Sequence, residues 1–116
     1  MNSEPKLFER FANQYKPMMV PFMLLYITDK LGKASSVEYK EELEKLAGKR
    51  LEYQYTSFYR LIYKMRYEFE VIEEVELVKE NGPARIYYGI TPLGKSLMKH
   101  IYDELIVPIK KIDLDE

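Results

Sequence analysis

The spacing of apolar residues predicts five helices and one β-hairpin along this 116-residue chain. A first helix is expected over residues 3–16, and Pro17 should end it because the residue before a proline disfavours helical geometry. Residues 18–31 are apolar nearly all round, which is typical of a buried central helix. Ser35 or Ser36 caps a third helix, which has a narrow apolar stripe and an otherwise charged surface.

The fourth helix is expected over residues 56–69, with Thr56 or Ser57 as its N-cap. One of its faces is apolar and is expected to lie in the core, with the side chains of Phe58, Leu61, Ile62, Met65 and Phe69. The opposite face carries tyrosines and positive charges, namely Tyr59, Arg60, Tyr63, Lys64 and Tyr67. Tyrosines beside Arg and Lys are unusual for a helix face that meets only water.

Two short strand-like runs follow this helix directly, at residues 71–78 and 84–91. Between them, Asn81-Gly82 is a standard hairpin turn signal. A helix followed at once by a two-stranded hairpin is the second half of a winged helix-turn-helix, a DNA-binding module. The pattern therefore predicts a mainly α fold with a small antiparallel β-hairpin wing over residues 71–91.

The last helix is expected over residues 92–107, with Thr91 as N-cap, Pro92 in its first turn and Pro108 as its end. Its apolar residues recur at every fourth position, and little chain remains to cover them. This helix and the first one either pack on their own domain or pack across a homodimer. In the second case the dimer contacts would be Leu7, Phe8, Phe11, Leu97, Ile101 and Leu105.

The length suits a single domain over residues 1–116. Within it, residues 17–91 would form the DNA-binding core, flanked by helices over 3–16 and 92–107. Residues 108–116 would form a frayed tail.

Overall charge argues against nucleic-acid binding, because the formal net charge is −1 and such proteins are usually basic. DNA binding would depend on a local concentration of positive charge. The start of the second helix of a helix-turn-helix enters the major groove, where Arg60 suits guanine. The candidate contacts on or just before this helix are Gln54, Thr56, Ser57, Tyr59, Arg60, Tyr63 and Lys64.

The wing offers Lys79 and Arg85, which flank its loop and suit phosphate or minor-groove contacts. Its first strand is acidic, so contact with DNA should be limited to the tip. The acidic residues are Glu73, Glu74, Glu76 and Glu80. The alternative for the helix is that Arg60 and Lys64 form ordinary surface pairs with Glu68 or its neighbours.

Catalytic and metal-binding functions find no support in the sequence. The chain has no cysteine, and His100 is its one histidine, so a transition-metal site or a positioned catalytic base lacks partners. We therefore expect neither an enzyme nor a cofactor. No apolar run reaches the roughly 18 residues of a membrane span, and the start lacks the apolar segment of a secretory signal. These features favour a cytoplasmic protein.

Three motifs resemble those of the PadR-type winged-helix transcription regulators. They are Phe58-Tyr59-Arg60-Leu61, Gly82-Pro83-Ala84-Arg85-Ile86-Tyr87-Tyr88 and Ile90-Thr91-Pro92-Leu93-Gly94-Lys95. The chain departs from the family where Arg60 replaces the usual proline and Glu70 replaces a common glycine. The broader MarR-like and archaeal Lrs-like groups share this layout. The resemblance implies a homodimer on a near-palindromic operator, built through the first and last helices; some relatives also bind small aromatic effectors.

Two other hypotheses remain open from the sequence. The acidic wing and the net charge are compatible with a winged-helix module that binds another protein and no DNA. A pocket lined by Phe, Tyr and Met between the terminal helices and the core would instead indicate a regulator that senses a ligand.

Overall fold

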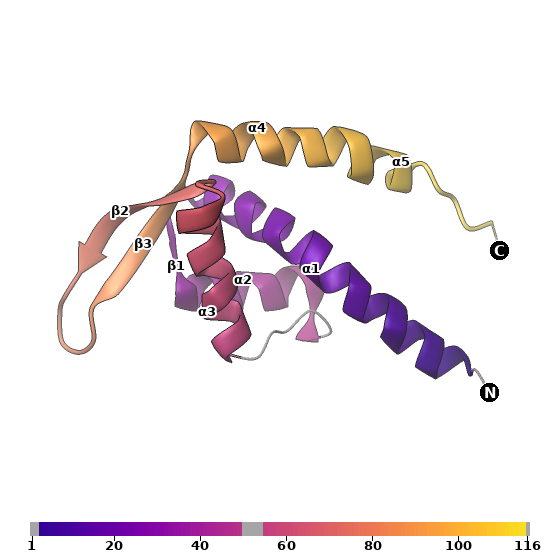
Figure 1. Cartoon of the computed structure of the whole chain (residues 1–116), viewed down its shortest axis with the longest axis horizontal. Helices are drawn as coiled ribbons and strands as arrows, with labels where there is room; N and C mark the ends of the chain where they lie inside the picture. The colour runs from indigo at the N-terminus through magenta and orange to yellow at the C-terminus, as the bar shows by residue number, and fades with distance from the viewer. Residues whose placement is uncertain (1–2, 50–54, 116) are drawn as a thin grey trace.

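The computed structural model describes residues 3–49 and 55–115 (Figure 1). Its elements are, in order, α1 (Glu4–Leu31), β1 (Ala34–Ser35), α2 (Ser36–Ala47), α3 (Tyr55–Tyr63), the π-helical turn η2 (Lys64–Glu68), β2 (Ile72–Val78), β3 (Arg85–Ile90), α4 (Pro92–Ile101), the π-helical turn η3 (Tyr102–Ile106) and α5 (Val107–Lys110). The predicted mainly α fold with a hairpin wing is confirmed. Figure 1 shows the hairpin extending from the body on the side away from both chain ends.

Helix α1 is continuous, so the predicted stop before Pro17 is wrong. Both Pro17 and Pro21 lie inside the helix. An interior proline costs about 3 kcal/mol, because it removes a backbone hydrogen bond and crowds the preceding turn. Immediately downstream, Val20, Leu24 and Leu25 are fully buried, and burying each such side chain contributes about 1.5–3 kcal/mol. This packing outweighs the local preference of the two prolines.

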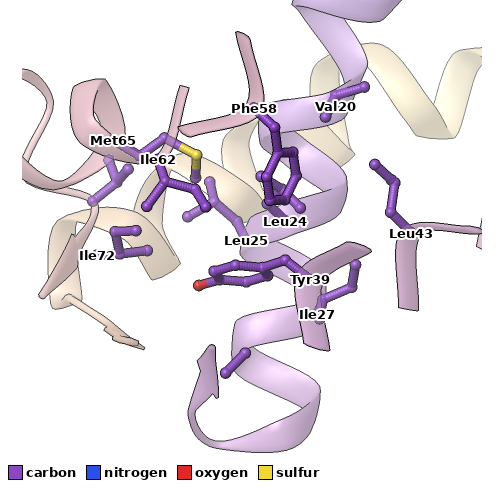
Figure 2. Packing of buried hydrophobic residues seen from close by; sticks show 12 residues of the cluster. Val20, Leu24, Leu25, Ile27, Tyr39, Leu43, Phe58, Ile62, Met65 and Ile72 are labelled. Atoms are coloured by element: carbon purple, nitrogen blue, oxygen red, sulfur yellow. The ribbon is translucent and has the colours of Figure 1, made fainter. Parts of the chain in front are cut away.

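The core lies between the C-terminal half of α1, helices α2 and α3, and the start of β2 (Figure 2). Its buried side chains are Val20, Leu24, Leu25, Ile27, Ala34, Tyr39, Leu43, Phe58, Ile62, Met65, Val71 and Ile72. The predicted core face of the fourth helix is therefore confirmed for Phe58, Ile62 and Met65, and Leu61 is half-buried. The prediction is wrong for Phe69, whose side chain is 52% exposed.

The reason for the error at Phe69 is the π-helical turn η2. Here the Phe69 N–H donates to the Lys64 carbonyl, five residues back, at 2.9 Å. A π turn holds more residues than an α turn, so it rotates the following side chains away from the face that regular helical spacing predicts.

A buried polar pair joins α1 to α2 inside this core. The hydroxyl of Thr28 donates to the Leu24 carbonyl at 2.6 Å and lies 2.6 Å from the Tyr39 hydroxyl. Burial raises the pKa of Tyr39 well above its ordinary value. The ring of Tyr39 also stacks on Tyr88 of β3, with 6.4 Å between the ring centroids. The core and the wing are thereby in direct contact.

The three strands form one antiparallel sheet in the order β1-β3-β2. The predicted hairpin is confirmed, with Ile72 opposite Ile90 and Val78 opposite Arg85. The pairing register shifts between Glu74 and Glu76, which marks a β-bulge. The short strand β1 was not predicted, because two residues are too few to show an alternating pattern.

The predicted helix N-caps are confirmed for α2 and α4 and wrong for α3. Ser35 caps α2 in a reciprocal capping box with Glu38. Thr91 caps α4 by accepting a hydrogen bond from the Gly94 N–H at 3.0 Å. By contrast, α3 begins at Tyr55, so Thr56 and Ser57 lie inside the helix and the predicted N-caps are wrong.

Helix α4 does not end at Pro108 as predicted; through η3 and α5 it continues to Lys110. In η3 the Val107 N–H donates to the Tyr102 carbonyl, five residues back. Pro108, which has no N–H to donate, follows directly. The π turn thus lets the chain pass a proline without stopping the helix.

Candidate nucleic-acid interface

The exposed face of α3 and η2 carries the side chains that the sequence assigned to DNA. Tyr59 and Tyr63 are 40% and 60% exposed, and Ser57, Arg60 and Lys64 are also exposed. The opposite face of α3 and η2 packs into the core. This packing keeps the face with the tyrosines and cations turned toward solvent. Gln54 lies outside the described residues, as does the side chain of Thr56, whose backbone belongs to α3.

Arg60 and Lys64 make no ion pair with any other residue of the described ranges 3–49 and 55–115. The surface pairing with Glu68 that the sequence allowed is therefore not formed. Their positive charges face solvent on the same helix face, where a phosphate or a base edge could meet them.

The acidic strand β2 uses two of its carboxylates for contacts within the molecule. Glu76 forms an ion pair with Lys33, which also lies 5.3 Å from the centroid of the Tyr87 ring. Glu74 accepts a hydrogen bond from the Tyr67 hydroxyl at 3.1 Å. The Lys33 charge offsets that of Glu76, whereas the neutral Tyr67 hydroxyl leaves the charge of Glu74 in place. Sequence reasoning could not find Lys33, because its partner lies 43 positions away.

The wing residues Lys79 and Arg85 are exposed at the base of the hairpin loop. Arg85 opposes Val78 in the last pair of the β2–β3 ladder, and Lys79 follows Val78 in the chain. The two cations therefore flank the loop, at the end of the hairpin farthest from its connection to α4 (Figure 1).

A further contact that the sequence did not suggest ties α3 to the start of α2. The Ser36 and Tyr59 hydroxyl oxygens lie 3.3 Å apart. This pair fixes the position of one tyrosine of the exposed face relative to the preceding helix of the helix-turn-helix.

The residues predicted for dimerisation lie on surfaces that the described chain leaves largely uncovered. On α1, Phe8 and Phe11 are 50% and 68% exposed, and Leu7 is also exposed. On the C-terminal helices, Leu97 and Leu105 are exposed and Ile101 is partly buried. Figure 1 shows α4 and the N-terminal half of α1 diverging toward the two chain ends.

An apolar groove of about 790 Å³ runs along α1, from Phe8 to Met23, and the end of α2. Its lining is Phe8, Phe11, Ala12, Gln14, Tyr15, Met18, Met23, Leu46 and Ala47. The composition matches the Phe, Tyr and Met lining that the ligand hypothesis requires. The C-terminal helices, however, contribute no side chain to the lining among the described residues.

His100 is exposed on α4, and no group of three His, Cys, Asp or Glu side chains in the described ranges could hold a metal ion. No helix among the described residues is long and apolar enough to cross a membrane.

Helices α2 and α3, followed by a hairpin wing, define a winged helix-turn-helix fold. No protein-family model and no curated protein matches the sequence. Solved structures do match the fold. A PadR-like transcriptional regulator from Bacillus cereus superposes with a TM-score of 0.67 at 22% identity, covering 89% of this chain and 99% of that one.

Two further structures are similar. A PadR-like transcription factor from Bacteroides fragilis gives a TM-score of 0.62 at 21% identity, over 88% of this chain and 96% of its own. A candidate transcriptional regulator from Thermoplasma acidophilum gives 0.64 at 18% identity, over 84% of this chain and 89% of its own. The chain therefore has the fold of PadR-like regulators, and the resemblance drawn from its motifs is confirmed at that level.

Proposed function

We propose that this protein is a homodimeric transcription regulator that binds DNA through α3 and the wing. The observation that carries the proposal is the pair of cations on the exposed face of α3 and η2, Arg60 and Lys64, which no described acidic side chain neutralises. Such a regulator would act in the cytoplasm.

In this arrangement residues 17–91 carry the DNA-binding unit. The outward face of α3 would enter the major groove, with Arg60 at a guanine and Lys64 and the hydroxyls of Ser57 and Tyr59 at phosphates. The wing would touch the backbone or the minor groove through Lys79 and Arg85 at its tip. The ion pair between Lys33 and Glu76 supports this arrangement, because the Lys33 charge offsets one of the carboxylates of β2.

The dimer would form through the flanking helices over 3–16 and 92–107. Exposed apolar side chains as large as Phe8 and Phe11 are costly in water, and burying them against a second copy would stabilise both chains. Two copies related by a two-fold axis would present two α3 helices to successive major grooves, which suits a near-palindromic operator.

A module that binds protein and no DNA is the second candidate, since the net charge is −1 and Glu73 and Glu80 remain exposed on the wing. The two functions differ in their dependence on salt. Neutralising phosphates releases counterions, so DNA affinity should fall steeply as salt rises. A protein complex held by apolar contacts should change far less.

The decisive experiment is selection of bound DNA from random sequence, followed by titration of the selected site at several salt concentrations. Arg60→Ala should weaken binding by about 1–3 kcal/mol and relax the preference at one base pair. Lys64→Ala should weaken all sequences similarly and reduce the salt slope by about one. Lys111→Ala, which removes one exposed charge beyond α5, is the matched control and should change little.

Failure to enrich any DNA at low salt would contradict the proposal and favour the protein-binding alternative. Sedimentation of the same samples tests the dimer. Phe11→Glu should shift the molecule toward monomer without unfolding it, because this side chain is 68% exposed in the single chain. A wild-type protein that sediments as a monomer at all concentrations would rule out the dimer.

A small aromatic effector is tested separately at the groove of α1 and α2. Binding there should raise the melting temperature of the wild type, since a ligand stabilises the state that binds it. Met18→Glu places a charge in the groove lining and should abolish the shift. No shift with any aromatic compound would remove the support for an effector.

A further inference from the structure

Tyr67 is not among the candidate DNA contacts, yet three neighbouring side chains restrain it. Its hydroxyl donates to the Glu74 carboxylate of β2 at 3.1 Å. Its ring lies against that of Tyr63, with 4.8 Å between centroids and a tilt of 43°. The Arg66 guanidinium carbon lies 4.9 Å from the centre of the same ring. An exposed side chain on a helix usually has few such restraints, and Tyr67 remains 53% exposed.

The contacts of Tyr67 connect the recognition surface to the wing and, through the wing, to the core. Glu74 pairs with Tyr88 in the β2–β3 ladder, and Tyr88 stacks on the buried Tyr39. The hydrogen bond to Glu74 raises the pKa of Tyr67, and burial followed by the nearby Glu74 charge raises the pKa of Tyr88. Both shifts agree with a close cluster around the Glu74 carboxylate.

We propose that Tyr67 is a positioning residue of the DNA surface, held by Glu74 so that it fixes the ring of Tyr63 and the angle between α3 and the wing. The inference rests on the proposed function, which supplies the DNA. The Tyr63 side chain is 60% exposed, which is more than that of Tyr67, and its ring contacts the Tyr67 ring.

The physical benefit is preorganisation. Ordering a free side chain on binding costs affinity, and a ring already held by its neighbour avoids much of that cost. The wing and α3 must also meet one DNA duplex together, so a link between β2 and η2 restricts their relative motion before binding. The same hydrogen bond engages the Glu74 carboxylate with a donor inside the protein.

The location of Tyr67 supports this role. It lies in the π-helical turn η2, which ends the helix that begins with α3 and leads to the wing. Beyond this turn, Glu70 takes a left-handed conformation with φ 56° before β2 begins. The chain therefore has two unusual backbone features between α3 and β2. The hydrogen bond from Tyr67, in the first, to Glu74 spans the second, at Glu70.

The test uses variants that remove the hydrogen bond from either side. Tyr67→Phe keeps the ring and loses the donor, and Glu74→Met keeps the length and loses the acceptor. Tyr67→Phe should weaken binding to the selected DNA site by about threefold, and Glu74→Met should bind about threefold more weakly than Glu73→Met, which removes the same charge. In the Glu74→Met background, Tyr67→Phe should have no further effect. Glu73→Met, the neighbouring carboxylate on β2, is the control; losing an acidic charge there should leave binding equal or tighter.

The slope of affinity against salt should stay unchanged in Tyr67→Phe, because no phosphate contact is lost. A loss of fold would instead lower the melting temperature together with binding, so thermal unfolding is measured on every variant. Equal binding by Glu74→Met and Glu73→Met, or fully additive effects of Tyr67→Phe and Glu74→Met, would overturn the proposal.

A second readout needs no DNA. Carbon-13 resonances of labelled tyrosine rings report the titration of Tyr67 in the free protein, where Glu74→Met should move its pKa down toward the ordinary value. No change would show that the hydrogen bond is absent and would also overturn the proposal. The wild type could bind no DNA and still show a Tyr67 pKa that falls in Glu74→Met. That result would overturn the positioning role together with the proposed function, and it would still establish the hydrogen bond between Tyr67 and Glu74.

Discussion

The two halves of α1 carry similar apolar side chains and use them in opposite ways. In the C-terminal half, Leu24 and Leu25 are fully buried against the other helices. In the N-terminal half, Phe8 and Phe11 are 50% and 68% exposed. Part of the difference lies in the sequence, because residues 18–31 are apolar nearly all round and residues 4–17 carry five charged side chains. The halves also differ in whether another element of the same chain covers the helix.

The C-terminal helices resemble the uncovered half of α1. Helix α4 is anchored at its start, where Thr91 and Gly94 contact the body, and its later turns carry exposed apolar residues such as Leu105 and Ile109. The core, α3 and the wing form a covered body, and the N-terminal half of α1 and the C-terminal helices form two exposed arms. This division suits a chain that folds by itself and then associates. In the proposed dimer, the body would present α3 and the wing, and the arms would contact a second copy.

Truncating a buried leucine in the body should have the largest effect on stability. Leu24→Ala removes a fully buried side chain and should lower the free energy of unfolding by about 3–5 kcal/mol. Leu7→Ala makes the same change on the uncovered half of α1 and should cost less than about 1 kcal/mol. Urea unfolding at one low protein concentration measures both. Equal losses would mean that the two halves of the helix do not differ as described.

The joint between the body and α4 should be the next most sensitive point. A Cβ added at Gly94 would lie 2.1 Å from the Val71 carbonyl oxygen, so Gly94→Ala must push α4 away from the body. We expect a loss of about 2–3 kcal/mol by urea unfolding. Ser96→Ala on the exposed side of the same helix is the control and should stay within about 0.5 kcal/mol. A neutral Gly94→Ala would show that α4 docks loosely.

The buried Tyr39 should make the body sensitive to alkaline pH. Its folded-state pKa is raised by burial, so folding favours the neutral phenol. That stability is fully present below the ordinary pKa of about 10 and is lost as the pH rises above it. Tyr39→Phe should cost about 1–2 kcal/mol at pH 7, through the lost contact with Thr28, and should flatten the alkaline decline.

Free energies of unfolding measured between pH 7 and 11.5 test this prediction. Tyr26→Phe, an exposed tyrosine of α1, serves as the control and should leave the slope as it is in the wild type. An unchanged slope in Tyr39→Phe would assign the alkaline sensitivity to other residues.

The smallest expected effect is a gain in stability from a substitution in the turn between η2 and the wing. Glu70 has φ 56°, a left-handed conformation that residues with a Cβ adopt at a cost. Glu70→Gly should stabilise the protein by about 0.5–1 kcal/mol, because glycine removes that cost despite its more flexible unfolded state. Glu68→Gly, two residues earlier in the helical turn, should instead destabilise by about 1 kcal/mol. The same sign for both variants would contradict the assignment of strain to Glu70.

The strain at Glu70 gives a physical meaning to a departure noted in the sequence. The resemblance to PadR-type regulators placed a common glycine at this position, and the backbone here has the geometry that glycine favours. The Thr91 hydroxyl donates to the Glu70 carbonyl at 2.8 Å, which helps hold the turn with a glutamate in it. A family pattern thus located a strained residue that hydrophobic periodicity could not reveal.

The sequence by itself determined the features that depend on near neighbours in the chain. The capping of α2 by Ser35 and of α4 by Thr91, the hairpin, and the outward side of α3 with Arg60 and Lys64 all follow from patterns within one or two turns. The candidate interface on α3 was predictable for this reason: a helix with one strongly apolar face can pack in only one orientation.

Only the tertiary structure decided features that depend on distant partners. The passage of α1 through Pro17, the third strand β1, the ion pair of Lys33 with Glu76 and the hydrogen bond of Tyr67 with Glu74 involve contacts that sequence spacing does not encode. Local preferences are worth a few kcal/mol at most, and the burial of several side chains together exceeds them. Where packing and local preference disagreed in this protein, as at Pro17, packing prevailed.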